Sequence, residues 1–417
     1  MRLRKVTIPA LPLLFLCLCG KAQQTVTLKG TVHDRGSKSI YLLPRTQSIR
    51  GEHKIEIPII DHQFKYTLAA DEVEAYELVF RDEYENGAWR PILFFPDTTE
   101  ISFKLYPMEA TGNEVKGGSI NRDFYAFRKM QDEIFKKRQQ EIGDEERELK
   151  KKGLFNSAAS DTIMAKIRRA GNMDERQALY EEREQMEKKG AHLTPRGIVW
   201  KERFDSVMRA IFIWKYKQFE KQPNLANYYF IYEDLENRVK SNPQLAQFIR
   251  QAYKQYALAY PKHKYTRLIQ YGLAAATQVF PGNAFVDVTA PDLKGKEQQL
   301  SALIKGKMAL IDLWGSWCGP CIAKSRKVVP LYEKYGNKGF TVVGIAREYG
   351  DTKELDKRLA MEKFSWTHLV ELDDKNSIWS KYGIPNAAGM FVLVDKNGKI
   401  LAVDPTIEEL EQHLAAL

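Results

Sequence analysis

Cysteine is scarce in this sequence, with four residues in a chain of 417. Cys17 and Cys19 lie in an apolar N-terminal segment, whereas Cys318 and Cys321 lie three positions apart in the last quarter of the chain. A chain with so few thiols has no framework of structural disulfides. If the N-terminal segment is removed on export, the one internal bridge still possible joins Cys318 to Cys321.

Long apolar runs are also lacking, so beyond the N-terminus no stretch is suited to crossing a bilayer. The N-terminus has three basic residues within positions 2–5, a nearly continuous apolar run over positions 6–18, and small residues at Gly20 and Ala22. This order is typical of an export signal. We therefore predict a signal peptide over residues 1–22, cleaved after Ala22, and a periplasmic location for the mature protein.

Two alternatives for this segment stay open. In the first, the apolar run is retained as a membrane anchor, which would leave the protein attached and facing the periplasm. In the second, a lipid anchor places Cys17 or Cys19 at the new N-terminus, although each follows a leucine where a small residue is expected.

Neither sign of charge dominates strongly, because 64 basic residues face 54 acidic ones and the formal net charge is +10. Loss of residues 1–22 would remove four basic residues and no acidic one, which leaves +6. Acids and bases are interleaved, as over residues 144–152, a pattern typical of a solvated helix face. The charge therefore does not indicate nucleic-acid binding, and we predict none.

Three patterns divide the chain, whose length exceeds that of one ordinary domain. Over residues 23–118, apolar residues recur at every second position, as at Val26 and Leu28, which predicts an antiparallel β domain with one buried face. Over residues 119–275 they recur every three or four positions between prolines, which predicts a helical region. We interpret its aromatic residues, such as Trp214 and Phe219, as core.

Residues 276–417 alternate between predicted strands and helices. The strands expected at 309–313 and 341–346 flank a helix from about Cys318 to Tyr335, and a hairpin at 390–403 precedes a last helix that opens with a capping box at Thr406 and Glu409. This order predicts an α/β sandwich. The fold class is therefore α+β and multidomain.

One segment combines the features that thiol chemistry needs, and it consists of Trp314-Gly315-Ser316-Trp317-Cys318-Gly319-Pro320-Cys321. It follows a predicted strand and opens a predicted helix. A thiol at a helix N-terminus meets unpaired backbone N–H groups and the positive end of the helix dipole, and both favour the reactive thiolate. Cys321 lies one turn further on, close enough to resolve a mixed disulfide at Cys318.

Asp312 lies on the preceding strand, six residues before Cys318. A carboxyl group inside an apolar strand is costly unless it has a task or a partner. We predict that Asp312 accepts a proton from Cys321 as that thiol attacks. A structural carboxylate with a satisfied hydrogen bond is the alternative.

The pair Cys318 and Cys321 could also be half of a zinc site. Zinc needs further ligands, and the sequence offers neither a second cysteine pair nor a histidine close to the motif. We therefore predict no metal and no cofactor.

On these residues the chain resembles the thioredoxin superfamily, and most closely its exported TlpA/ResA-like branch. The core from Trp317 to Cys321 matches thioredoxin itself, Asp312 matches the family's buried aspartate, and the lead-in over residues 291–307 is similar to that branch. The resemblance covers about a third of the chain and implies a thioredoxin-like domain. The β domain and helices before it resemble, more loosely, an uncharacterised module of Gram-negative bacterial proteins.

The resemblance also implies which residues dock the substrate, and they are Trp317, Gly319, Pro320, Gly389 and Met390. Here the chain departs from the family, which has a cis-proline at the position of Gly389 or Met390, whereas the nearest proline is Pro385. A cis peptide without proline costs about 3 kcal/mol. We expect either a trans loop or the use of Pro385 through a shifted loop.

The leading functional hypothesis is a reductase of protein disulfides, kept reduced by a membrane-bound electron donor. The Cys-Gly-Pro-Cys spacer resembles that of reducing thioredoxins more than that of oxidising DsbA. A disulfide oxidase or isomerase is the first alternative, and a partner-binding module with an accessory thioredoxin domain is the second. The sequence carries no signal for an oligomeric state.

A thiol peroxidase is a further alternative, because peroxiredoxins share the lead-in to the motif. Their peroxidatic cysteine usually follows a Thr or Ser by three residues, and this chain has Gly315 there.

The predicted export signal can be tested directly. We expect the N-terminal sequence of the protein recovered from the periplasm of a bacterial host to begin at Gln23. A chain that begins at Met1 would indicate a retained anchor, and one that begins at an acylated Cys17 or Cys19 would indicate a lipid anchor.

Overall fold

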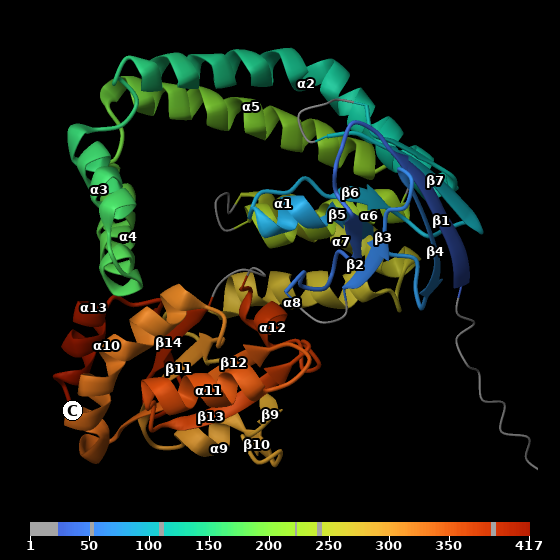
Figure 1. Cartoon of the computed structure of the whole chain (residues 1–417). Coiled ribbons are helices and arrows are strands. Elements are labelled where there is room, and N and C mark those ends of the chain that lie inside the picture. Colours follow the sequence, from blue (N-terminus) through green and yellow to red (C-terminus); the bar gives the residue numbers. More distant parts are fainter. Residues whose placement is uncertain (1–23, 51–53, 108–111, 222, 240–243, 385–388) are drawn as a thin grey trace, which may run out of the picture.

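A computed structural model describes residues 24–50, 54–107, 112–221, 223–239, 244–384 and 389–417. The predicted signal peptide lies outside these residues. Within them, no helix combines the length and the apolar character needed to cross a membrane. Figure 1 shows strands in the N-terminal part, a long arch of helices in the middle and a mixed domain at the C-terminus.

The N-terminal part is a β-sandwich of two four-stranded sheets. The first sheet has the order β4 (Gln63–Ala70), β1 (Gln24–Val32), β7 (Glu100–Leu105), β8 (Glu114–Lys116). The second has the order β3 (Ile55–Pro58), β2 (Ser39–Pro44), β5 (Tyr76–Phe80), β6 (Ile92–Phe94), and a short helix α1 (Arg81–Glu85) follows β5. The alternating residues that predicted these strands meet in the core between the two sheets, where Val26 and Leu28 of the first sheet and Ile57 of the second are buried.

One pairing departs from the predicted antiparallel domain. β1 and β7 run parallel, with Leu28 opposite Ile101 and Gly30 opposite Phe103, while the other pairs of the two sheets are antiparallel. Parallel neighbours need a long crossover. Here the chain supplies it, because the whole second sheet lies between β1 and β7 in sequence.

Strands β2, β5 and β6 of the second sheet are buried on both faces rather than on the one face predicted. In the β6 region, Ile92 and Phe94 point into the sandwich core, whereas Leu93 and Phe95 belong to the core of the helical region. Successive strand residues point to opposite faces, so this sheet serves two cores at once. The β domain and the helices are therefore joined by packing as well as by the chain.

The middle of the chain is helical, as predicted. Its helices are α2 (Ser119–Lys151), α3 (Ala158–Arg169), α4 (Met173–Lys188), α5 (Pro195–Phe219), α6 (Leu225–Arg238), α7 (Leu245–Ala259) and α8 (Lys264–Gln278). Side-chain caps at Ser157, Asn172, Thr194 and Asn224 fix four of the starts. The long helices α2 and α5 lie side by side and form an arm that carries the α3–α4 hairpin at its far end (Figure 1).

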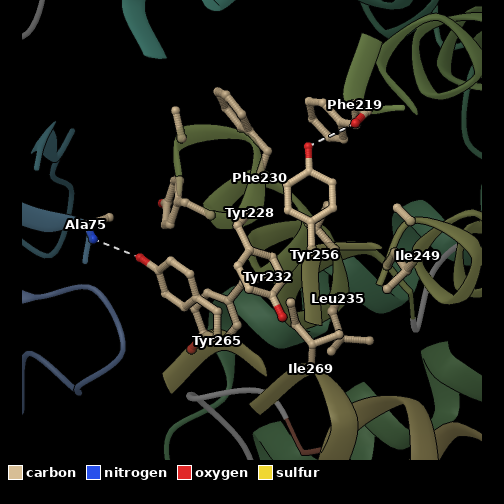
Figure 2. Close-up of a cluster of buried hydrophobic side chains, with 14 of the residues drawn as sticks. Ala75, Phe219, Tyr228, Phe230, Tyr232, Leu235, Ile249, Tyr256, Tyr265 and Ile269 are labelled. Carbon is tan, nitrogen blue, oxygen red and sulfur yellow. Dashed lines mark hydrogen bonds between the residues drawn. The ribbon is translucent and has the colours of Figure 1, made fainter. Parts of the chain in front are cut away.

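Aromatic side chains fill the core between α2, α5, α6, α7 and α8 (Figure 2). The prediction that these residues are core is confirmed, because Phe219 and Phe230 are buried and Trp214 packs against the same cluster. The hydroxyl of Tyr256 donates to the carbonyl oxygen of Phe219 at 3.1 Å, which satisfies a polar group inside the core. Tyr265 links this core to the β domain, since its hydroxyl oxygen accepts the backbone N–H of Ala75 at 2.7 Å.

The C-terminal domain has a five-stranded sheet with the order β13 (Thr367–Leu372), β12 (Phe340–Glu348), β11 (Met308–Trp314), β14 (Met390–Val394), β15 (Ile400–Val403). β11, β12 and β13 are parallel, and β14 and β15 form an antiparallel hairpin. A small ribbon of β9 (Thr289–Pro291) and β10 (Glu297–Gln299) precedes the sheet.

Helices cover both faces of this sheet. The core of one face includes residues of α9 (Leu300–Ile304) and α12 (Ile378–Tyr382), and that of the other includes residues of α10 (Gly319–Tyr335), α11 (Lys353–Glu362) and α13 (Ile407–Leu414). A short 3₁₀ turn, η1 (Gly336–Lys338), follows α10. The predicted α/β sandwich is confirmed, and so is the capping box at Thr406 and Glu409.

The link between Tyr265 and Ala75 predicts a measurable cost. Replacing Tyr265 by Phe leaves the ring in place but removes the acceptor for a buried N–H group. We expect a loss of about 1–3 kcal/mol in the free energy of unfolding, measured by urea denaturation. Tyr180→Phe, which removes a hydroxyl from an exposed tyrosine, is the control and should change stability little. An unchanged midpoint for Tyr265→Phe would contradict the assigned link.

Candidate active site

The two cysteines lie at the N-terminus of α10, directly after β11. Cys318 is the N-cap residue, and its sulfur accepts the backbone N–H of Cys321 at 3.3 Å. A disulfide joins the two residues, whose Cα atoms are 5.3 Å apart. The unpaired N–H groups of the first turn and the helix dipole both favour a thiolate at Cys318 once the bond is reduced.

A buried carboxylate holds the loop that leads into α10. Glu348, at the end of β12, accepts the backbone N–H of Ser316 at 2.8 Å and its hydroxyl at 2.7 Å. Burial raises the pKa of Glu348, and the two hydrogen bonds from Ser316 oppose that rise. Sequence reasoning missed Glu348, because the predicted strand ended at Ala346, whereas β12 continues to Glu348.

The indole of Trp317 is fixed against the same strand end, because its Nε1 donates to the carbonyl oxygen of Arg347 at 2.8 Å. Gly315 makes room for this ring: a Cβ atom there would lie 2.7 Å from Trp317 Nε1 and 3.0 Å from the Arg347 oxygen. The Thr or Ser that a peroxidase has at this position would displace Trp317, which argues against the peroxidase alternative.

Asp312 points under α10. In β11, Leu310 and Trp314 face the core that contains α10, and Asp312 shares that face because side chains alternate along a strand. Its Oδ2 accepts the hydroxyl of Ser325 at 2.7 Å, and its Oδ1 has no hydrogen-bond partner among the described residues. Ser325 lies one turn after Cys321 on the same face of α10.

Burial raises the pKa of Asp312 to about 7, and the hydrogen bond from Ser325 and the charge of Lys324 oppose the rise. The carboxyl group is therefore poised to gain or lose a proton near neutral pH. It has both the satisfied hydrogen bond of the structural alternative and a free oxygen. Sequence reasoning missed Ser325, whose spacing from Cys321 is the one signal that could have identified it.

Gly389 and Met390 approach the cysteines from the start of β14. A Cβ atom on Gly389 would clash with the carbonyl oxygen of Leu313 and lie 2.8 Å from the sulfur of Cys321, so only glycine fits this position. Pro385 lies outside the described residues, and the peptide bonds within them include no cis bond. The backbone at Gly389 thus comes close to the sulfur without a side chain between them.

All eight residues predicted for the site line one cleft of about 440 Å³, and they are Asp312, Trp317, Cys318, Gly319, Pro320, Cys321, Gly389 and Met390. Its other side comes from distant parts of the chain. Helix α4 contributes Gln177, Glu181 and Lys188, and Arg50 of the β domain stacks its guanidinium 4.8 Å from the Trp317 ring. Sequence reasoning did not bring α4 or Arg50 to the site, because nothing local marks them.

The described residues include no group of three or more His, Cys, Asp or Glu side chains placed to hold a metal ion. The groups that this arrangement offers for chemistry are the thiol pair at the start of α10 and the carboxyl group beneath that helix. The expectation of no metal and no cofactor stays a prediction.

The Redoxin family matches residues 280–414 of the chain. The thiol-disulfide oxidoreductase ResA of Geobacillus thermodenitrificans is 29% identical over 144 residues, which are 34% of this chain and 80% of that protein. ResA of Bacillus anthracis is 30% identical over 126 residues, which are 30% of this chain and 70% of that protein. The thioredoxin domain of a thiol-disulfide oxidoreductase from Bacteroides vulgatus is 27% identical, with a TM-score of 0.30, and the match covers 33% of this chain and 96% of that one.

Fold, site and relatives together define an enzyme of the thiol-disulfide oxidoreductase class with a thioredoxin-like C-terminal domain. Through that domain the chain belongs to the ResA family of thiol-disulfide oxidoreductases.

The raised pKa of Asp312 predicts a pH-dependent stability. Its ordinary value is 3.8 and its folded value is about 7, so between these pH values the folded state binds more protons than the unfolded state. Stability contributed by Asp312 is therefore lost as pH rises through this window. The free energy of unfolding of the oxidised Asp312→Asn variant, relative to that of the parent, should therefore rise by up to about 4 kcal/mol from pH 4 to pH 8.

Urea denaturation at several pH values measures this difference. Asp144→Asn, at an exposed carboxyl on α2, serves as the control for loss of a charge. Parallel stability profiles for the parent and Asp312→Asn would contradict the assigned burial.

Proposed function

We propose that the protein is an exported reductase of protein disulfides in which Cys318 is the nucleophile, Cys321 resolves and Asp312 accepts a proton. One observation carries the proposal: the thiol pair opens α10 above a buried carboxyl group with a free oxygen, and all three residues line one cleft. Trp317, Gly319, Pro320, Gly389 and Met390 line the same cleft and are proposed to dock the substrate.

The reaction begins with the reduced thiol pair. The thiolate of Cys318 attacks one sulfur of the substrate disulfide, a new S–S bond forms, and the other substrate sulfur leaves as a thiolate. Cys321 then attacks Cys318 in this mixed disulfide. The second substrate sulfur leaves, and the enzyme keeps the disulfide between its own cysteines, so two electrons pass to the substrate.

Asp312 serves the second step. Cys321 is nucleophilic only after it loses its proton, and this partly buried thiol lines the same cleft as Asp312. A carboxyl group with a pKa of about 7 is matched to accept a proton at neutral pH. Ser325 holds this carboxyl in place and leaves its other oxygen free.

The proposed direction is reduction, because the Cys-Gly-Pro-Cys spacer matches that of reducing thioredoxins. A reductase outside the cytoplasm needs electrons from across the membrane, so we propose a membrane-bound electron donor as the second partner. Proteins with disulfides are the proposed substrates. Export rests on the N-terminal pattern described above.

A redox titration tests the direction. The mature protein is equilibrated in glutathione buffers, and the disulfide between Cys318 and Cys321 is followed by thiol labelling. We expect a potential near that of thioredoxin, about −270 mV. A potential near about −120 mV would instead indicate an oxidase or isomerase. Cys321→Ser, which cannot form the internal disulfide, is the control. If the parent formed no such disulfide at any ratio of reduced to oxidised glutathione, the redox function would be refuted.

A further inference from the structure

Helix α4 lies across the cleft from the cysteines, although it is about 130 residues away in sequence. Met173, in its first turn, lies close to Gly319, the residue after Cys318. A Cβ atom at Gly319 would be only 3.2 Å from the methyl carbon of Met173. Asp174 accepts two hydrogen bonds from Arg326 at 3.0 and 3.1 Å. Glu181 accepts a hydrogen bond from Lys327 at 3.1 Å, so two ion pairs join α4 to α10.

The attachment of α4 is polar rather than hydrophobic. None of its residues is fully buried, whereas the other helices of ten residues or more each bury at least one. The helix reaches α10 because the arm of α2 and α5 carries the α3–α4 hairpin to the C-terminal domain (Figure 1). Partly exposed ion pairs contribute little to stability. Neither the burial of apolar surface nor these ion pairs therefore gives α4 a large stabilising role at the cysteines.

The position of α4 restricts what reaches Cys318. The residue is 6% exposed, and it lies within the cleft that α4 lines on one side and Gly389 and Met390 on the other. A sulfur under attack must come within about 3–3.5 Å of the nucleophile. A disulfide on the broad surface of a folded protein would have to displace α4 to come so close, whereas one extended segment of chain is narrow enough to enter.

The cleft also continues beyond the cysteines. A second cavity of about 380 Å³ shares Glu184, Lys188 and Met390 with the first. Further on, its lining includes apolar side chains from α6 and α8, among them Leu235 and Ala276. An extended segment with its disulfide at Cys318 would therefore have room for neighbouring apolar side chains along this groove.

We propose that α4 is a substrate-selecting wall, which admits disulfides on extended or unfolded polypeptide segments and excludes those on the surfaces of folded proteins. The proposal rests on the reductase function proposed above and names the substrate class of the same site. The acids and bases on the wall are mixed and largely paired, so its shape rather than its charge makes the selection.

Two matched substrates test the wall. Both carry a mixed disulfide between one cysteine and glutathione, placed either in a short unstructured peptide or on the surface of a folded domain with no other cysteine. The reduced enzyme reacts in single turnover, and its internal disulfide is measured after acid quenching. We expect the peptide to react roughly tenfold faster or more. Oxidised glutathione is a disulfide small enough to pass the wall, so its reduction tests the thiol chemistry alone.

Charge reversal of the two ion pairs tests the role of α4. The double variant Asp174→Lys/Lys327→Glu sets like charges against Arg326 and Glu181 and leaves the net charge unchanged. We expect the folded domain to react roughly fivefold faster, with little change for the peptide. Lys334→Glu is the control, because it breaks an ion pair between another part of α10 and Glu411 of α13. If the double variant loses its fold by circular dichroism, Met173→Ala removes the contact over Gly319 and should shift the ratio in the same direction.

The outcomes separate the two proposals. Equal rates for the two substrates with the parent enzyme overturn the wall, and so does a preference that neither the double variant nor Met173→Ala changes. Failure to react with oxidised glutathione and with both substrates overturns the reductase function itself.

Discussion

The aromatic core between α2, α5, α6, α7 and α8 is the packing on which the site depends. It binds the second sheet of the β domain through Leu93 and Phe95, and it fixes the base of the arm that ends in α4. Helix α8, on its far side, contacts α12 of the C-terminal domain. The cleft takes its walls from all three regions, so its shape depends on a core that contains none of its cysteines. A mutation in this core would change the surroundings of the thiols by shifting α4 and Arg50.

Within the C-terminal domain, two buried carboxyl groups divide the work around the motif. Glu348 is satisfied by both polar groups of Ser316 and so acts on the loop that presents Cys318. Asp312 is satisfied on one oxygen only, so it keeps the capacity to take a proton. Burial raises the pKa of each, and the count of hydrogen bonds distinguishes a positioning group from a proposed proton acceptor.

Local signals predicted much of this structure. Period-two patterns indicated the strands, and the spacing of Cys318 and Cys321 after a buried strand indicated the helix start and the thiol chemistry. The parallel pairing of β1 with β7 could not be predicted, because residue alternation is the same in either direction. The contact of α4 with the site was equally hidden, since an exposed, mixed-charge helix resembles any solvated one. The predicted domain boundaries and the assigned roles of the site residues stay predictions.

The two-point attachment of α4 has a consequence for recognition. The α3–α4 hairpin is tethered by α2 at one end and by α5 at the other, so it meets α10 as part of the same chain. A tethered contact is governed by an effective local concentration rather than by how much protein is present. Weak ion pairs at Asp174 and Glu181 can therefore keep the contact populated at any dilution. A recognition element that worked as a separate subunit would need a far larger interface to achieve the same occupancy.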